Sequence, residues 1–251
     1  MVKNEHVELI PIFDDNYVFV LIDNAGKKAV VVDPGDAGPV TEFLRAKKLD
    51  LTAILVTHHH SDHIGGVAAL KNTFGCPVYA PEKNQKQIPQ ADHWLKEGDV
   101  VKLSPWEFTI LELPGHTLGH IAYWDQQHKW LFSGDVIFGL GCGRLFEGSH
   151  EQGYASLQRI KKLPPQTLIY CTHEYTERNL DFCRILTNQD NTPITGDSEA
   201  LELYANELSN RRDLGLPSVP LKLSIEESTN PFLLAQDAEQ FRYLRELRNR
   251  Q

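Results

Sequence analysis

The sequence predicts mixed α/β layers around an extensive sheet, followed by a smaller helical domain. Short β-rich runs fill the first two-thirds of the chain, and helical patterns lie between some of them. Turn-forming residues at 23–26 and 125–128 separate consecutive β-rich runs, which indicates antiparallel as well as parallel pairs. After about residue 174 helical patterns replace the β-rich runs. We therefore expect one domain over residues 1–174 and a helical domain over residues 175–251.

Each element follows from its own pattern. Strands are expected where β-branched and aromatic residues are concentrated, in the runs HVELIPIF, YVFVLID, AVVVD, AILVT, PVYA, VVKL, FTILELP, IAYW, WLFSG and LIYC. Helices are expected where apolar residues recur every three or four positions, over residues 40–47, 64–74, 154–163, 177–186, 198–212 and 235–250. Pro193, PSVP and NPF separate the last three helices.

Composition restricts the class of protein. The 251 residues suffice to bury a core, and no apolar run approaches the roughly 18 residues that a membrane helix needs. Glu5 and Glu8 interrupt the amino-terminal region, so no secretory signal is expected and, if the sequence is complete, the protein stays in the cytoplasm. The cysteines are widely spaced without a CxxC pair, which fits reduced thiols better than disulfides.

The charge balance restricts the partners. A net charge of -9 argues against a general nucleic-acid binder, because the phosphate groups would be repelled. An anionic ligand would need a local basic cluster. We expect a small-molecule partner, no nucleic acid, no membrane, and a monomer.

Four β-rich runs each end in a residue of a type that binds metal ions. LVT is followed by His58, LELPG by His116, LFSG by Asp135 and LIYCT by His173. If these strands share sheets, the four loops converge on one rim, which is where α/β proteins usually place a site.

The first of these loops contains four histidines and one aspartate within positions 58–63. Two ligand sets in one loop suit two metal ions, and a carboxylate such as Asp135 can bridge both ions. The alternative is a solvated histidine-rich turn or an adventitious metal site; the three further matching loops favour a functional site. His59 is expected to point elsewhere. The ligand residues of the loop are His58, His60, Asp62 and His63.

Two further residues near the motifs have open roles. His120, in GHTLGH, is more consistent with a structural role than with metal ligation. Asp33 ends the run AVVVD, and it either orients a ligand histidine or only begins the turn at DPG.

The motifs THHHSDH, PGHTLGH, SGD and THEYT occur in this order and together resemble the metallo-β-lactamase superfamily. The resemblance implies an α+β fold, an αββα sandwich with a dinuclear site. It implies that one metal is held by His58, His60 and His116, the other by Asp62, His63 and His173, and that Asp135 bridges them. Two divalent ions are expected, with zinc favoured and iron or manganese as alternatives. Asp62 and Asp135 are also predicted to be the catalytic carboxylates.

A narrower resemblance covers essentially the full chain. GDVIFGLGCGRLFEG, CTHEYT and the tail with NPF and FRYLRELRNR resemble the hydroxyacylglutathione hydrolase (glyoxalase II) family. The resemblance implies hydrolysis of S-D-lactoylglutathione to glutathione and D-lactate, a step of methylglyoxal detoxification. It also implies that glutathione is bound by Arg144, Tyr175, Arg245 and Arg248. Phe146 departs from the family pattern, in which some members have a tyrosine, so a hydrogen bond to glutathione is missing or replaced.

The tail supports this interpretation on physical grounds. Phe241, Leu244 and Leu247 recur at helical spacing and predict a buried stripe, with Arg245 and Arg248 one turn apart on an adjacent face. Two guanidinium groups there can bind carboxylates bidentately. The alternative is that arginines favour the carboxyl end of a helix through its dipole. Another basic residue, Arg144, in an acidic protein favours the first interpretation.

The expected chemistry is hydrolysis by a metal-bridged hydroxide. Two metal ions lower the pKa of a bridging water, and one of them can polarise the thioester carbonyl. No GxSxG motif is present, and no cysteine has an obvious histidine partner in the sequence. A thiolate leaving group with a pKa of about 8.5 departs without a strong acid.

Competing functions would use the same site on a different substrate. They are those of a lactonase, another thioesterase, and a persulfide dioxygenase with one iron. The metal count and the helical tail discriminate between these, because the tail is the part connected to glutathione. A non-catalytic module stabilised by its metals is a third possibility, and the complete ligand set disfavours it.

Overall fold

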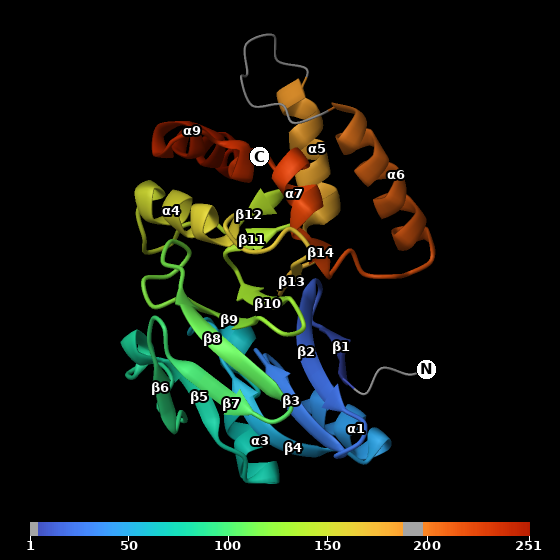
Figure 1. Cartoon of the computed structure of the whole chain (residues 1–251), viewed down its shortest axis with the longest axis vertical. Coiled ribbons are helices and arrows are strands. Elements are labelled where there is room, and N and C mark those ends of the chain that lie inside the picture. Colours follow the sequence, from blue (N-terminus) through green and yellow to red (C-terminus); the bar gives the residue numbers. More distant parts are fainter. Residues whose placement is uncertain (1–4, 188–197) are drawn as a thin grey trace. The chain divides into compact units, whose positions relative to one another are not determined.

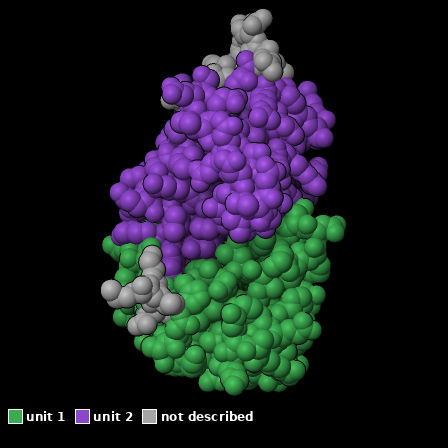
Figure 2. Space-filling model, turned by 90° about the vertical axis from the view of Figure 1, so that its right-hand side faces the viewer, with its two compact units in different colours: residues 1–112, 119–128 green, residues 113–118, 129–251 purple. Residues whose placement is uncertain are grey.

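The computed structural model describes residues 5–187 and 198–251 (Figure 1). Residue contacts divide the chain into two compact units (Figure 2). Unit 1 comprises residues 1–112 and 119–128, and unit 2 comprises residues 113–118 and 129–251. These limits differ from the predicted domain boundary after residue 174, which stays a prediction.

Unit 1 contains a six-stranded mixed sheet in the order β1-β2-β3-β4-β5-β6. The first three strands pair antiparallel, and β3 to β6 pair parallel. The predicted turn at 23–26 is confirmed, since Asp23 pairs with Lys28 across the β2–β3 hairpin. The strands are β1 Glu5–Ile12, β2 Asn16–Asp23, β3 Lys28–Val32, β4 Asp50–Leu55, β5 Val78–Pro81 and β6 His93–Leu95.

A second group of strands in unit 1 is antiparallel: β7 Val100–Leu103, β8 Trp106–Glu112 and β9 Ile121–Asp125. Tyr123 of β9 donates its hydroxyl to the Val56 carbonyl (2.9 Å), directly after β4. Burial raises the pKa of Tyr123 well above its usual value, so the hydroxyl keeps its proton. This bond ties the second strand group to the carboxyl end of β4.

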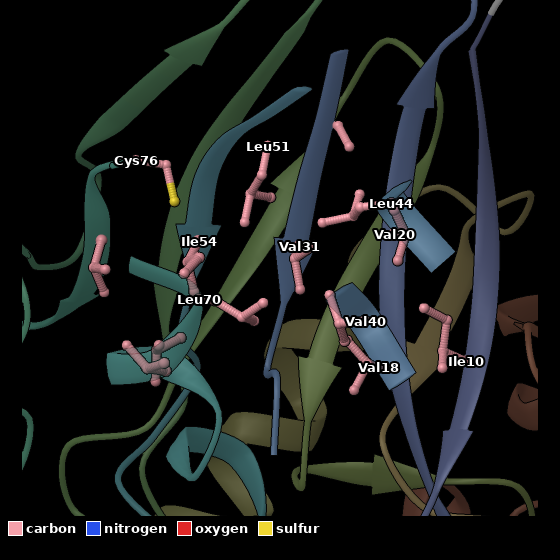
Figure 3. Close-up of a cluster of buried hydrophobic side chains, with 14 of the residues drawn as sticks. Ile10, Val18, Val20, Val31, Val40, Leu44, Leu51, Ile54, Leu70 and Cys76 are labelled. Carbon is pink, nitrogen blue, oxygen red and sulfur yellow. The ribbon is translucent and has the colours of Figure 1, made fainter. Parts of the chain in front are cut away.

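Helices α1 Ala37–Lys47 and α3 Val67–Phe74 cover the six-stranded sheet of unit 1. Figure 3 shows Val40 and Leu44 of α1 and Leu70 of α3 beside the sheet side chains Val31 and Ile54. All of these side chains are fully buried. Burial of these apolar side chains holds β3 and β4 in place against the two helices. The starting points of the loops that follow both strands are therefore fixed.

The predicted helix over residues 64–74 is interrupted, which corrects that expectation. The chain instead forms a short helix α2 Ser61–Ile64 and then α3, with Gly65 and Gly66 between them. Gly66 donates its N–H to the Pro34 carbonyl (2.8 Å), and a Cβ there would meet the backbone of residues 34–37. The close approach of the loop after β3 therefore breaks the helix.

Unit 2 contains β10 Trp130–Gly134 parallel to β13 Leu168–Cys171, and β14 Leu221–Lys222 antiparallel to β13. A small hairpin, β11 Ile137–Phe138 and β12 Gly141–Cys142, follows β10. Helix α4 His150–Ile160 begins earlier than the predicted residue 154, because Ser149 and Gln152 form a capping box at its start.

The predicted carboxyl-terminal helices are confirmed to within a few residues as α5 Thr176–Thr187, α6 Ser198–Asp213 and α9 Ala238–Asn249. Two short helices, α7 Leu223–Thr229 and α8 Pro231–Leu234, were not predicted. Pro193 lies outside the described residues. Within the described part of the chain, no helix is long and apolar enough to cross a membrane.

Helix α7 carries a carboxyl group in the interior of unit 2. Glu226 is fully buried and accepts hydrogen bonds from the Tyr204 hydroxyl (2.7 Å), the Asn230 amide (3.0 Å) and the Leu140 N–H (2.9 Å). Burial raises the pKa of Glu226 from its usual 4.5 to about 7, and the three hydrogen bonds act in the opposite direction.

This pKa predicts a pH-dependent stability. Between about pH 4.5 and pH 7 the folded chain binds more protons at Glu226 than the unfolded chain, so ionisation lowers the free energy of unfolding as pH rises. Between these two pH values, the free energy of unfolding of Glu226→Gln should rise by roughly 3 kcal/mol relative to that of wild type. Denaturant unfolding at about pH 5 and about pH 8 measures the difference. The adjacent Glu227→Gln is the control, and equal pH slopes for wild type and Glu226→Gln would contradict the prediction.

Candidate metal centre

The loop after β4 gathers four predicted ligand side chains within unit 1. The ring of His58 lies 4.7 Å from that of His60 and 4.0 Å from that of His63, centroid to centroid. Ligand atoms of His58 lie within 4.8 Å of those of both other histidines, and the same holds between Asp62 and His63. His58 and His63 are buried, whereas His60 and Asp62 are half-buried.

A buried carboxylate at the end of β3 orients two of these histidines. Asp33 accepts the Thr57 N–H (2.7 Å), the Thr57 hydroxyl (2.6 Å) and Nδ1 of His63 (2.9 Å). Because the Thr57 proton goes to Asp33, the hydroxyl oxygen is left to accept from Nδ1 of His58, 3.1 Å away. Both rings then carry their proton on Nδ1 and have the lone pair on Nε2.

Asp33 has both of the roles considered above: it orients histidines of the predicted ligand set, and it begins the DPG turn. Its backbone is left-handed, with φ of 50°, and its carbonyl accepts the Gly35 N–H in the turn. Gly35 has no room for a side chain, since a Cβ would overlap the Asp62 carbonyl. The DPG turn thus brings the loop after β3 against the ligand loop, while the Asp33 carboxylate binds it.

Three neighbours complete the surroundings of the loop. Asn16 of β2 donates to Oδ2 of Asp62 (2.9 Å), an interaction that sequence reasoning missed. Nδ1 of His59 lies 3.1 Å from the Asn84 amide, a partner outside the ligand set. His120 is buried with its ring stacked on that of His58 at 4.7 Å.

The other three predicted ligands lie together within unit 2. Oδ2 of Asp135 is 3.4 Å from Nε2 of His116 and 3.3 Å from Nε2 of His173. Asp135 follows β10 and His173 follows β13, and because these strands are parallel, their carboxyl ends meet at one edge. Gly143 packs so closely on the Asp135 carbonyl that a Cβ would overlap it.

The donor set of unit 2 suits a cation. Nδ1 of His116 donates to the Arg144 carbonyl at 2.7 Å, so Nε2 of a neutral ring has a lone pair and no proton. That lone pair and the Asp135 carboxylate are then two acceptors facing each other. A divalent ion between them satisfies both, and neutral imidazole and carboxylate are ligands of zinc, iron and manganese.

The residues expected to bind substrate also belong to unit 2. The ring of Tyr175 stacks on that of His173, with centroids 4.8 Å apart and planes within 5°. Arg144 is exposed, with its guanidinium 5.5 Å from the centre of the Phe146 ring. Phe146 is 61% exposed and presents an edge contact to His116. Aromatic rings thus flank two proposed ligands.

Family models match almost the whole chain. Residues 13–173 match the metallo-beta-lactamase superfamily, and residues 174–251 match the hydroxyacylglutathione hydrolase C-terminus. The chain is 83% identical over 251 residues, all of both chains, to a hydroxyacylglutathione hydrolase of Bdellovibrio bacteriovorus. The chain belongs to the hydroxyacylglutathione hydrolase family.

Solved structures share the fold of this chain. ETHE1 from Myxococcus xanthus has a TM-score of 0.70 and 24% identity, covering 96% of this chain and 90% of that chain, and it shows the fold alone. TTHA1623 in a di-iron-bound form has a TM-score of 0.55 and 30% identity, covering 67% of this chain and 91% of that chain. The predicted metallo-β-lactamase fold with a carboxyl-terminal helical region is confirmed.

Membership in the hydroxyacylglutathione hydrolase family makes the chain a metal-dependent hydrolase. Together with the histidine and aspartate clusters, the fold indicates a dinuclear metal site. The individual ligand assignments remain predictions.

The two carboxyl-terminal arginines, expected one turn apart on one face of the helix, differ in their exposure. Arg245 is only 6% exposed, and its Nη1 donates to the Cys142 carbonyl at 2.7 Å. Arg248 is half-buried, and its Nε donates to Oδ1 of Asn179 at 3.3 Å. Helical spacing identified both arginines, but it did not show which of them the neighbouring β11–β12 hairpin covers.

A third arginine was missed. The guanidinium of Arg178 lies 6.0 Å from the centre of the Tyr175 ring. Burial, and then the charges of Arg245 and Arg178, lower the pKa of Arg248. Among the described residues, none of these three guanidiniums forms an ion pair with a carboxylate. The spacing of three residues between Tyr175 and Arg178 is the signal that could have found it.

Asp33→Asn should weaken metal binding without unfolding the chain. Asparagine tolerates the left-handed backbone of position 33, but it loses the carboxylate that orients His63 and, through Thr57, His58. A loss of about 10- to 100-fold in metal affinity is expected. Competition with a chromophoric chelator measures it. Asp36→Asn, at the N-cap of α1, is the control, and unchanged affinity in Asp33→Asn would show that Asp33 is only a turn residue.

Proposed function

We propose that this protein hydrolyses S-D-lactoylglutathione to glutathione and D-lactate. The observation that supports it most is a cluster of Arg178, Arg245 and Arg248: Arg178 lies beside Tyr175, whose ring stacks on His173, and Arg248, one turn after Arg245, donates to Asn179, the residue next to Arg178. This arginine cluster is a local basic site in a protein of net charge -9, and glutathione carries two carboxylates. The name of the Bdellovibrio relative agrees with this substrate class.

We further propose that the two ligand clusters bind one pair of ions. His58, His60 and His116 would hold the first ion, Asp62, His63 and His173 the second, and Asp135 would bridge them. The protonated Nδ1 atoms of His58, His63 and His116 support this, because each leaves Nε2 for a metal. Zinc is the favoured metal, with iron and manganese as alternatives. When bound, such a pair supplies an activated water and polarises the thioester carbonyl.

The chain's own residues bind and orient the substrate in this proposal. Arg248 and Arg178 attract the glutathione carboxylates, Tyr175 offers its hydroxyl beside them, and Arg144 adds an exposed cation. Asp62 and Asp135 remain the predicted catalytic carboxylates through their hold on the ions. The departing thiolate has a pKa of about 8.5 in its reference state, so it needs no side-chain acid.

A cysteine nucleophile is disfavoured. Burial raises the pKa of all four thiols, to about 11 for Cys76 and about 12 for Cys183. A buried, protonated thiol is a poor nucleophile. Hydrolysis by activated water therefore fits the described residues better than a covalent thioester exchange.

We also predict that the protein acts in the cytoplasm as a monomer, without nucleic-acid or membrane partners.

Hydrolysis of S-D-lactoylglutathione by the purified protein tests the function. Turnover should be lost after chelation and return with added zinc, iron or manganese. The dimethyl ester of the same thioester lacks the carboxylates and should be hydrolysed poorly. Absence of turnover by a protein shown to contain two metal ions would reject this substrate.

Asp135→Ala tests the bridging role. Without this carboxylate the ions lose their shared ligand, so both metal content and activity should fall. Elemental analysis of the purified variant measures the loading. Two ions per chain in Asp135→Ala would contradict the assignment.

Arg248→Ala tests the carboxylate site. A lost charge-assisted hydrogen bond of roughly 1.5–3 kcal/mol corresponds to an increase in KM of about 10- to 100-fold, with kcat nearly unchanged. The KM for the dimethyl ester should not change, because this substrate has no carboxylate for Arg248 to bind. Arg242→Ala is the matched control, because Arg242 is exposed on the same helix and pairs with Glu239 and Glu246. An unaltered KM in Arg248→Ala would remove this residue from the site.

A further inference from the structure

Five consecutive residues after β10, the 138–142 segment, have their backbone bound by side chains of the helical region of unit 2. Figure 1 shows the β11–β12 hairpin among these helices, near α5 and α7. Asn230 donates to the carbonyls of Phe138 and Gly141, Asn179 to that of Gly139 and Arg245 to that of Cys142, while Glu226 accepts the Leu140 N–H, all between 2.7 and 3.1 Å.

Asn230 and Glu226 form the centre of this network. Both are fully buried, and the Asn230 amide also donates to Oε2 of Glu226 at 3.0 Å. Oδ1 of Asn230 accepts the Phe232 N–H and begins α8, with Pro231 at its first position. The NPF motif therefore combines a helix cap with an amide that reaches the segment.

The segment depends on these contacts for its shape. Leu140 has a left-handed backbone with φ of 57°, which is unfavourable for a leucine. Its side chain is fully buried among Leu180 of α5 and Leu201 and Leu208 of α6. Burial of the side chain and the bond from its N–H to Glu226 together hold a conformation that the segment would not adopt alone.

The segment joins two parts of the proposed site. It begins three residues after Asp135 and ends two residues before Arg144. At its far end Gly143 donates its N–H to the Val136 carbonyl and packs on the Asp135 carbonyl. The Arg144 carbonyl in turn accepts from His116. A change in the path of the segment would move Arg144 relative to Asp135.

We propose that Glu226 and Asn230 are positioning residues that hold the 138–142 segment, and through it Arg144 and Arg245, in the conformation that binds the glutathione moiety. The proposal rests on the proposed function for its substrate. It assigns a role to NPF that neither metal binding nor substrate contact requires.

Two variants separate positioning from general stability. Asn230→Ser keeps an oxygen for the cap of α8 and removes both amide donors to the segment. Glu226→Gln keeps its contacts: the amide oxygen accepts from Leu140 and Asn230, and the amide nitrogen donates to the Tyr204 oxygen. Ser228→Ala is the matched control on α7, since the Ser228 hydroxyl donates to the local Ile225 carbonyl and has no bond to the 138–142 segment among the described residues.

The kinetic experiment compares these variants on S-D-lactoylglutathione, each with two metal ions confirmed. Asn230→Ser should raise KM about tenfold with kcat changed by less than about threefold, because positioning of bound carboxylates is lost and the metal site is kept. Ser228→Ala should stay within about twofold of wild type in both constants, and Glu226→Gln, which keeps an acceptor for the Leu140 N–H, should raise KM less than Asn230→Ser does. An unchanged KM in Asn230→Ser, or a fall in kcat alone, would overturn the proposal.

Hydrogen exchange of the Leu140 amide tests the positioning independently of catalysis. Asn230→Ser should accelerate this exchange by about tenfold or more, whereas Ser228→Ala and Glu226→Gln should not. Unaltered exchange in Asn230→Ser would overturn the positioning role even if the enzyme is active. The wild-type protein could fail to hydrolyse the thioester while Asn230→Ser still accelerates exchange of the Leu140 amide. That result would support the positioning role and reject only the proposed substrate.

Discussion

Protonation of three proposed ligand histidines (His58, His63 and His116) on Nδ1 is the constraint on which the proposed chemistry depends, because only Nε2 is then available to a metal. In unit 1 a single carboxylate, Asp33, imposes this on His63 directly and on His58 through Thr57. The fold supplies Asp33 by pairing β3 with β4 in parallel, so that both strands end at the same edge. In unit 2 a backbone carbonyl has the same effect on His116.

Much of the fold, and the candidate site residues, could be predicted because four of the proposed ligands (His58, His116, Asp135 and His173) each follow an apolar run. That pattern alone was enough to identify His116, Asp135 and His173 as candidates, and the turn residues alone were enough to predict the β2–β3 hairpin. The break between α2 and α3 could not be predicted, since it depends on the approach of Pro34 to Gly66. The burial of Arg245 was missed for the same reason: helical spacing gives the face of a residue, but not what covers it.

The arginine cluster shows how local and total charge can differ. The protein is acidic as a whole, yet Arg178, Arg245 and Arg248 lie close enough for their charges to act on one another. Burial and the neighbouring charges of Arg245 and Arg178 both disfavour the charged form of Arg248, and a bound anion would offset the repulsion between the arginines. This charge distribution supports our proposal that the cluster binds a carboxylate-bearing ligand.

The buried thiols have a consequence for the redox behaviour of the protein. Cys142, Cys171 and Cys183 are close to the proposed site in sequence or in space, and burial keeps each of them protonated and away from solvent. Thiol–disulfide exchange needs an accessible thiolate. Because all four cysteine thiols are buried, oxidised glutathione should form mixed disulfides with the folded protein only slowly.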